Sequence, residues 1–239
     1  MRRFLFWSLC FCLLFPVGLS SCDGSDSAAV IFGGTTGKLT WTLTEDGVLT
    51  ITGEGPMPDY RDGGTSETPP WYPHVNRISS LTIGEGVTRI GDYAFMLCSF
   101  VTEVVIPESV TSMGDWAFRK CTGLQEAYIG DGVTEIAAKA FAECTALKTV
   151  VIGKSIQRIG DQAFNTRSSW DQMTLEKITV LFDDIASGSF PVLESGSRGV
   201  FPKPGGWDLV SYKIYVPKGT KAEYQKNWSD YSSLIVEMQ

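Results

Sequence analysis

The stretch LTIGEGVTRIGDYAF at residues 81–95 decides the fold, because its pattern returns at intervals of 23 residues. It recurs as VVIPESVTSMGDWAF at residues 104–118, as AYIGDGVTEIAAKAF at residues 127–141 and as VVIGKSIQRIGDQAF at residues 150–164. A fixed period of this length indicates a chain built from similar small coils, none of which can bury its apolar side alone. The sequence therefore predicts that the coils stack on one another around a shared core.

Each unit is expected to begin with a short strand. Alternation places Leu81 and Ile83 toward the core and Ser80 and Thr82 toward solvent. The position of Ile83 is aliphatic in every copy, and a glycine or proline follows it and ends the strand. A period of about 20 to 29 residues with aliphatic residues at fixed positions is typical of leucine-rich repeats. We therefore predict an α/β repeat solenoid, a leucine-rich repeat with units of about 23 residues.

The last part of each unit contains an Ala-Phe pair. In three copies an aspartate stands two residues before the alanine, at Asp92, Asp115 and Asp161. An aspartate in this place suits the N-cap of a short helical or 3₁₀ turn, which is the local structure that we expect.

Three cysteines follow the same period, at Cys98, Cys121 and Cys144. Stacked coils lie about 4.8 Å apart, and each thiol would face the same apolar layer of the core. We therefore predict buried free thiols rather than a metal site or a disulfide.

Both ends of the repeat array are predicted to be capped. Residues 38–77 are interpreted as an N-terminal β-hairpin cap and loop, because alternating apolar residues flank an Asp-Gly turn pair at positions 46 and 47. The repeats are placed at residues 78–180. Residues 181–239 are interpreted as an irregular repeat and a C-terminal helix/strand cap, with the helix at 221–228 and the strand at 234–236.

The first residues are interpreted as an export signal rather than as part of the fold. Arg2 and Arg3 precede an uncharged apolar run of 16 residues, at 4–19, which is short for a membrane span. Small residues then lead into Cys22, as in the lipobox of bacterial lipoproteins, which this segment resembles. Residues 1–21 are therefore predicted to be a lipoprotein signal peptide, and residues 22–37 a lipidated Cys22 with a flexible tether. We expect an exported protein at the outer membrane or cell surface, anchored to the membrane by lipid at Cys22.

Composition argues against several classes of function. The chain has 27 acidic and 20 basic residues and a formal net charge of −7, which disfavours binding to nucleic acid. His74 is the only histidine, so the sequence excludes metal clusters built on several histidines. The stretch GGTTGK at 33–38 has Phe32 where a phosphate-binding loop needs glycine and Leu39 where it needs serine or threonine. We expect no catalytic residues, no metal site and no cofactor.

Together the units resemble the BspA-like leucine-rich repeat family, whose pattern joins a strand, an Ile-Pro or Ile-Gly step and Val-Thr-x-Ile-Gly-x-x-Ala-Phe-x-x-Cys. The resemblance covers about residues 39–228. It implies a surface protein of adhesin type, which binds proteins or glycans at host or bacterial surfaces. A glycan-handling or envelope-scaffolding accessory protein without catalysis is the alternative.

Outward-facing residues of the predicted strands form the candidate binding site, on what we expect to be the concave face of the sheet. Val105, Tyr128 and Val151 would make an apolar row across three strands, with Glu103 and Glu126 beside them. Contiguous exposed apolar residues with flanking charges can mark a protein contact. The same residue types also suit any solvent-facing strand, and this second interpretation stays open.

Overall fold

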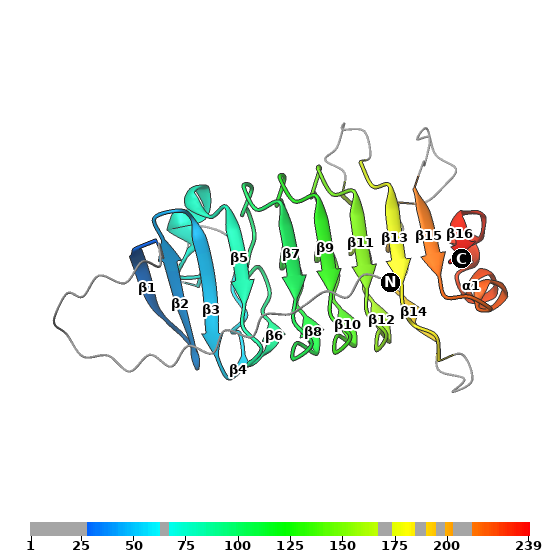
Figure 1. Cartoon of the computed structure of the whole chain (residues 1–239), viewed down its shortest axis with the longest axis horizontal. Coiled ribbons are helices and arrows are strands. Elements are labelled where there is room, and N and C mark those ends of the chain that lie inside the picture. Colours follow the sequence, from blue (N-terminus) through cyan, green and yellow to red (C-terminus); the bar gives the residue numbers. More distant parts are fainter. Residues whose placement is uncertain (1–27, 63–66, 167–173, 185–189, 195–198, 203–211) are drawn as a thin grey trace.

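The computed structural model describes residues 28–62, 67–166, 174–184, 190–194, 199–202 and 212–239. These residues form three sheets and a few short helices (Figure 1). One sheet contains β1 (Val30–Thr36), β2 (Leu39–Thr44), β3 (Val48–Gly53) and β5 (Ser80–Ile83).

The other two sheets run along the repeats. The first has the members β4 (Gly55–Pro56), β6 (Val87–Ile90), β8 (Ser112–Met113), β10 (Glu135–Ile136), β12 (Arg158–Ile159) and β14 (Val192–Leu193). The second, called the main sheet below, has the members β7 (Glu103–Ile106), β9 (Glu126–Ile129), β11 (Thr149–Ile152), β13 (Lys177–Val180), β15 (Lys213–Val216) and β16 (Ile235–Glu237). The coils that begin with β7, β9, β11 and β13 contribute one strand to each of these two sheets. Figure 1 shows β5, β7, β9, β11, β13 and β15 side by side in one row.

Equivalent residues of successive coils lie in register. Ile106 is paired with Ile129, and Ile129 with Ile152, along parallel strands. All three isoleucines are at most 3% exposed, and Ile83, on β5, is 8% exposed. The prediction of a leucine-rich repeat is confirmed, its strands run parallel, and the aliphatic positions of the repeat form its core.

A column of stacked phenylalanine rings runs through the interior of the coils. Neighbouring ring centroids are 5.0 to 5.4 Å apart along the series Phe95, Phe118, Phe141, Phe164 and Phe201. Every ring of the series is at most 1% exposed. Phe201 lies in the stretch that the sequence analysis interpreted as irregular, yet it continues the column, because the backbone N–H of Phe164 donates to the carbonyl of Val200 at 3.0 Å.

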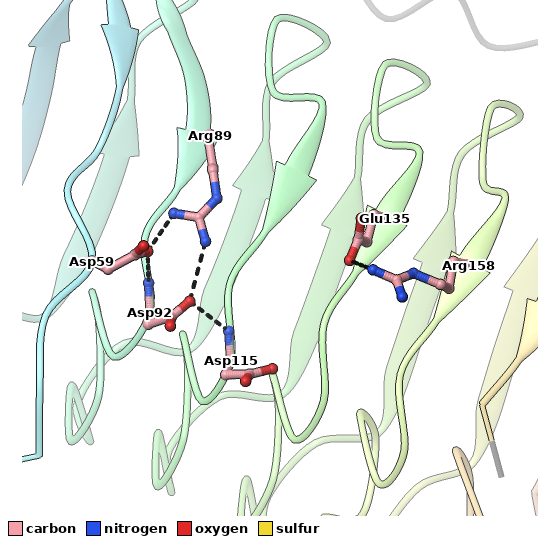
Figure 2. Close-up of polar contacts among 6 residues, drawn as sticks. All are labelled: Asp59, Arg89, Asp92, Asp115, Glu135 and Arg158. Atoms are coloured by element: carbon pink, nitrogen blue, oxygen red, sulfur yellow. Dashed lines mark hydrogen bonds and ion pairs between the residues drawn. The ribbon is translucent and has the colours of Figure 1, made fainter.

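The predicted N-cap role of the aspartates is wrong. The carboxylate of Asp92 accepts a hydrogen bond from the backbone N–H of Asp115 in the next coil, at 2.9 Å (Figure 2). The carboxylate of Asp59 accepts one from the backbone N–H of Asp92, at 3.0 Å. The residue after Asp92, Tyr93, has φ of 55°, and Trp116 after Asp115 has φ of 59°, so a right-handed helical turn cannot start there. The carboxylates of Asp59 and Asp92 therefore bind the backbone of a later segment of the chain, and neither caps a helical turn.

The N-terminal end is larger than expected. Residues 30–36, assigned above to the flexible tether, form strand β1, which pairs antiparallel with β2, so this part of the tether prediction is wrong. The hairpin of β2 and β3 is present, and β3 pairs in parallel with β5. Trp71, which is fully buried, packs edge-on against Trp41 with ring centroids 6.1 Å apart, and its indole N–H donates to the carbonyl of Ala94 at 2.8 Å.

The C-terminal end consists of α1 (Lys221–Asn227), the 3₁₀ helix η3 (Ser229–Leu234) and β16. Tyr224 on α1 is fully buried, and its hydroxyl donates to the carbonyl of Phe182 at 2.9 Å. The buried core runs as one cluster from Leu39 to Ile235. It therefore joins both ends to the coils between them.

The three repeated cysteines are free and buried, as predicted. The thiols of Cys121 and Cys144 donate to the carbonyls of Phe95 and Phe118, at 3.1 and 3.0 Å. Burial raises the pKa of the Cys98 and Cys121 thiols well above the ordinary value. These side chains are core residues and link consecutive coils.

Candidate functional site

The residues proposed from the sequence meet on the outward face of the main sheet. Val105 on β7 is the register partner of Tyr128 on β9, which in turn pairs with Val151 on β11. Val105 is 55% exposed, whereas the other two are half-buried. An apolar row thus crosses three neighbouring strands.

The two glutamates lie two residues before this row. Glu103 is the register partner of Glu126, so their carboxylates stand on adjacent strands of one face. The hydroxyl of Tyr128 donates a hydrogen bond to the carboxylate of Glu126. This hydrogen bond, with burial and the charges of both glutamates, raises the pKa of Tyr128 to about 12. Tyr128 is therefore oriented along its own strand, and its hydroxyl stays protonated at neutral pH.

Farther along the same face the residues change character. Thr149 on β11 continues the column of the glutamates, and Lys177 on β13 and Lys213 on β15 complete it. The ammonium of Lys177 lies 5.2 Å from the ring centroid of Tyr215, a cation–π contact. The face thus carries acids at one end and bases at the other.

A second surface feature was missed by the sequence analysis. The rings of Tyr93 and Trp116, at equivalent positions of consecutive coils, are stacked with centroids 6.2 Å apart and an interplanar angle of 10°. Arg119 and Lys139 lie over the Trp116 ring at 4.5 and 4.4 Å from its centroid. The signal in the sequence was an aromatic residue before Ala-Phe in two successive copies.

A cleft of about 840 Å³ lies beside this stack. Tyr60 and Tyr93 supply aromatic surface, and Asp59, Asp62 and Asp92 supply carboxylates. Asp59 and Asp92 both pair with Arg89 (Figure 2). Asp62 pairs with Arg119 at 3.1 Å. The carboxylates of the cleft are therefore largely compensated by arginines of the same chain.

His74 has a packing role. Its ring stacks on Phe32 of β1 with centroids 3.7 Å apart, within the 3₁₀ helix η1 (Tyr72–Arg77). Burial, and then the charge of Arg77, lowers its pKa below the ordinary value. The ring of His74 therefore packs at the junction between η1 and the N-terminal sheet.

Within the part of the chain that the structure describes, no group of three or more His, Cys, Asp or Glu side chains is placed to hold a metal ion. The same residues include no helix with the length and apolar character needed to cross a bilayer. Cys22 and the predicted signal peptide lie outside the described residues.

The stacked coils, with their strands paired in parallel and in register, define a leucine-rich repeat protein. Residues 72–190 match six copies of the BspA type leucine rich repeat region, and the chain belongs to this family. No curated protein matches the chain.

Two solved bacterial structures are similar to this fold. A leucine-rich repeat protein from Eubacterium ventriosum is 28% identical, with a TM-score of 0.58 over 79% of this chain and 44% of its own. The pneumococcal vaccine antigen PcpA is 20% identical, with a TM-score of 0.50 over 68% of this chain and 36% of its own. The chain thus spans less than half the length of either protein.

Proposed function

We propose that this protein is a surface-displayed lipoprotein whose repeats bind other macromolecules, with adhesion through protein–protein contact as its role. One observation carries the proposal: the apolar row of Val105, Tyr128 and Val151 on the outward face of the main sheet. A contiguous apolar strip flanked by charges suits a protein interface better than bulk solvent. The family to which the chain belongs agrees with a binding role.

A triple variant tests whether the row binds. We expect Val105→Ser with Tyr128→Ser and Val151→Ser to weaken binding to immobilised host matrix proteins at least about tenfold, because apolar contact area is lost at the centre of the interface. Pull-down and surface plasmon resonance against a panel of such proteins measure the change. The matched control is Phe100→Ser with Val192→Ser, since both of these side chains are 58% exposed away from the row. Equal binding by the triple variant and the parent would show that this face of the main sheet is not the binding site.

A second variant tests the anchor. We expect Cys22→Ala to prevent lipid attachment and to move the protein from the membrane fraction to the soluble fraction, because the thiol is the proposed attachment point. Fractionation and mass spectrometry of the N-terminal peptide measure this. Protease treatment of whole cells then separates display on the surface from retention beneath it. A Cys22→Ala protein that still carries acyl chains would contradict the proposal.

Glycan binding is the second candidate function, and the cleft beside Tyr93 favours it. Aromatic surface from Tyr60 and Tyr93 with nearby carboxylates is a combination of apolar and polar groups that small-ligand sites use. A glycan array probed with the parent tests this candidate, and glycan binding that survives the triple variant would exclude the row as its site.

A further inference from the structure

The outward column of charges on the main sheet has opposite signs at its two ends. In order along the repeats the residues are Glu103, Glu126, Thr149, Lys177 and Lys213, one on each of β7, β9, β11, β13 and β15. The column therefore reads acid, acid, neutral, base, base. Its change of sign is centred on β11.

Within the described residues, none of these four charged side chains belongs to an ion pair. Two of the four make other contacts: Glu126 accepts the hydrogen bond from Tyr128, and the ammonium of Lys177 lies over the ring of Tyr215. The other long sheet differs, because its surface charges neutralise one another.

Figure 2 shows this compensation on the other sheet. Arg89 pairs with Asp59 and Asp92, and Arg158 pairs with Glu135. Arg158 also pairs with Glu194, at 2.7 Å. The charges of the main sheet thus remain available to a partner, whereas those of the other sheet are used within the chain.

The arrangement is self-complementary. Consider a second copy that lies face to face with the first, related to it by a two-fold axis that is parallel to β11 and runs between the two faces. The order of the strands is then reversed in the second copy. Glu103 would then face Lys213 of the second copy, and Glu126 would face Lys177. In the neighbouring column Val151 would meet its own counterpart on the axis, Tyr128 would face Thr179 of the second copy, and Val105 would face Tyr215.

We propose that the outward face of the main sheet binds a second copy of this chain, in antiparallel order about β11. The inference rests on the proposed binding function of this face and names its partner. Adjacent strands about 4.8 Å apart and four residues of about 3.3 Å each give a patch roughly 19 Å by 13 Å. Such a patch falls below the 1,200 Å² or so of total buried area that marks stable complexes. The pairing is therefore weak in solution, depends on ionic strength, and gains strength when many copies stand on one surface.

Charge reversal tests the pairing. The acid-to-base variant is Glu103→Lys with Glu126→Lys, and the base-to-acid variant is Lys177→Glu with Lys213→Glu. Residues 28–239 suit the experiment because they hold the entire core cluster from Leu39 to Ile235. Sedimentation velocity at about 0.01 M salt, where the Debye length is near 30 Å, measures self-association.

The parent is expected to self-associate, and each variant alone to do so at least about tenfold more weakly, because like charges then face each other. An equimolar mixture of the two variants regains association, since every facing pair in the mixed dimer is again opposite in sign. The control, Glu54→Lys with Glu85→Lys, makes the same change in net charge at exposed sites off the column and associates like the parent.

A parent that stays monomeric at every concentration, or a mixture that behaves like its components, overturns the inference. If such a parent still binds a matrix protein through the row of Val105, Tyr128 and Val151, the proposed function stands and only the second copy is wrong as the partner. If the control loses association as the variants do, net charge rather than facing pairs is responsible, and the two-fold arrangement is wrong.

Discussion

Replacing Phe141 by alanine is expected to lower the free energy of unfolding by about 3–5 kcal/mol, because it empties a central position of the phenylalanine column. The Phe141 ring is fully buried and is stacked between Phe118 and Phe164, with centroids 5.0 and 5.3 Å away. The cavity would lie between two coils that cannot close on it without shifting the in-register strands. Coils on either side depend on this contact, so the loss should also reduce the cooperativity of unfolding.

Urea unfolding followed by circular dichroism and tryptophan fluorescence measures the effect. Phe100→Ala is the matched control, because the same side chain at 58% exposure is removed from the surface; it should change the stability by less than about 0.5 kcal/mol. Similar unfolding midpoints for the two variants would show that the column does not hold the coils together.

The repeat core was predictable from the sequence because every coil places its aliphatic residues against the same neighbours. Once Ile83, Ile106, Ile129 and Ile152 are aligned by period and alternation, the parallel register follows, and so do the outward positions of Val105 and Tyr128. The burial of the cysteines followed from the same reasoning. Residues that recur with the period of the sequence therefore occupy equivalent positions in successive coils.

Features that depend on contacts outside the period were not predictable in this way. Strand β1 contains Gly33 and Gly34, which have low strand propensity, and it exists because β2 supplies its hydrogen bonds. Phe201 continues the phenylalanine column across a longer connection that hides its equivalence to Phe164. The role of Asp92 was assigned wrongly because its partner lies in the next coil rather than in its own turn.

The sequence predicted which residues of the candidate site share one face of the sheet, but it did not predict how their side chains interact. Alternation placed Glu103 and Glu126 side by side, but the hydrogen bond from Tyr128 to Glu126 depends on a side-chain conformation that no spacing encodes. The stack of Tyr93 on Trp116 requires the left-handed backbone of both residues, which residue type alone would not predict.

The protein is expected to unfold in alkali, between about pH 10 and pH 12, because buried tyrosines and thiols must keep their protons for the fold to survive. Burial raises the pKa of Tyr60 and Tyr231 to about 12, and raises the pKa of Tyr212 and Tyr224 further. The buried thiols described above are shifted in the same direction.

The sign follows from comparing the two states. In the unfolded chain these groups lose their protons near their ordinary pKa values, about 9 for the thiols and about 10 for the tyrosines, whereas in the folded chain they retain them. The unfolded state therefore binds fewer protons, and stability is fully present below about pH 9 and falls as the pH rises through the shifted values. Each deeply buried group contributes a loss of about 1.4 kcal/mol per pH unit over this window. A few such groups acting together exceed the usual stability of a folded domain, about 5–15 kcal/mol.

Two signals recorded together measure the effect: far-ultraviolet circular dichroism and tyrosinate absorbance near 295 nm. A fraction of the eight tyrosines should ionise only as the dichroism is lost, and both signals should recover on return to neutral pH. Tyr212→Phe tests the cause, since it removes one retained proton and should make stability fall less steeply above about pH 10. At neutral pH the same change costs about 1 kcal/mol, from the lost hydrogen bond of the hydroxyl to the carbonyl of Pro202 at 2.6 Å. An unfolding midpoint in urea that stays level from pH 8 to pH 11 would mean that these hydroxyls and thiols do not couple proton release to unfolding.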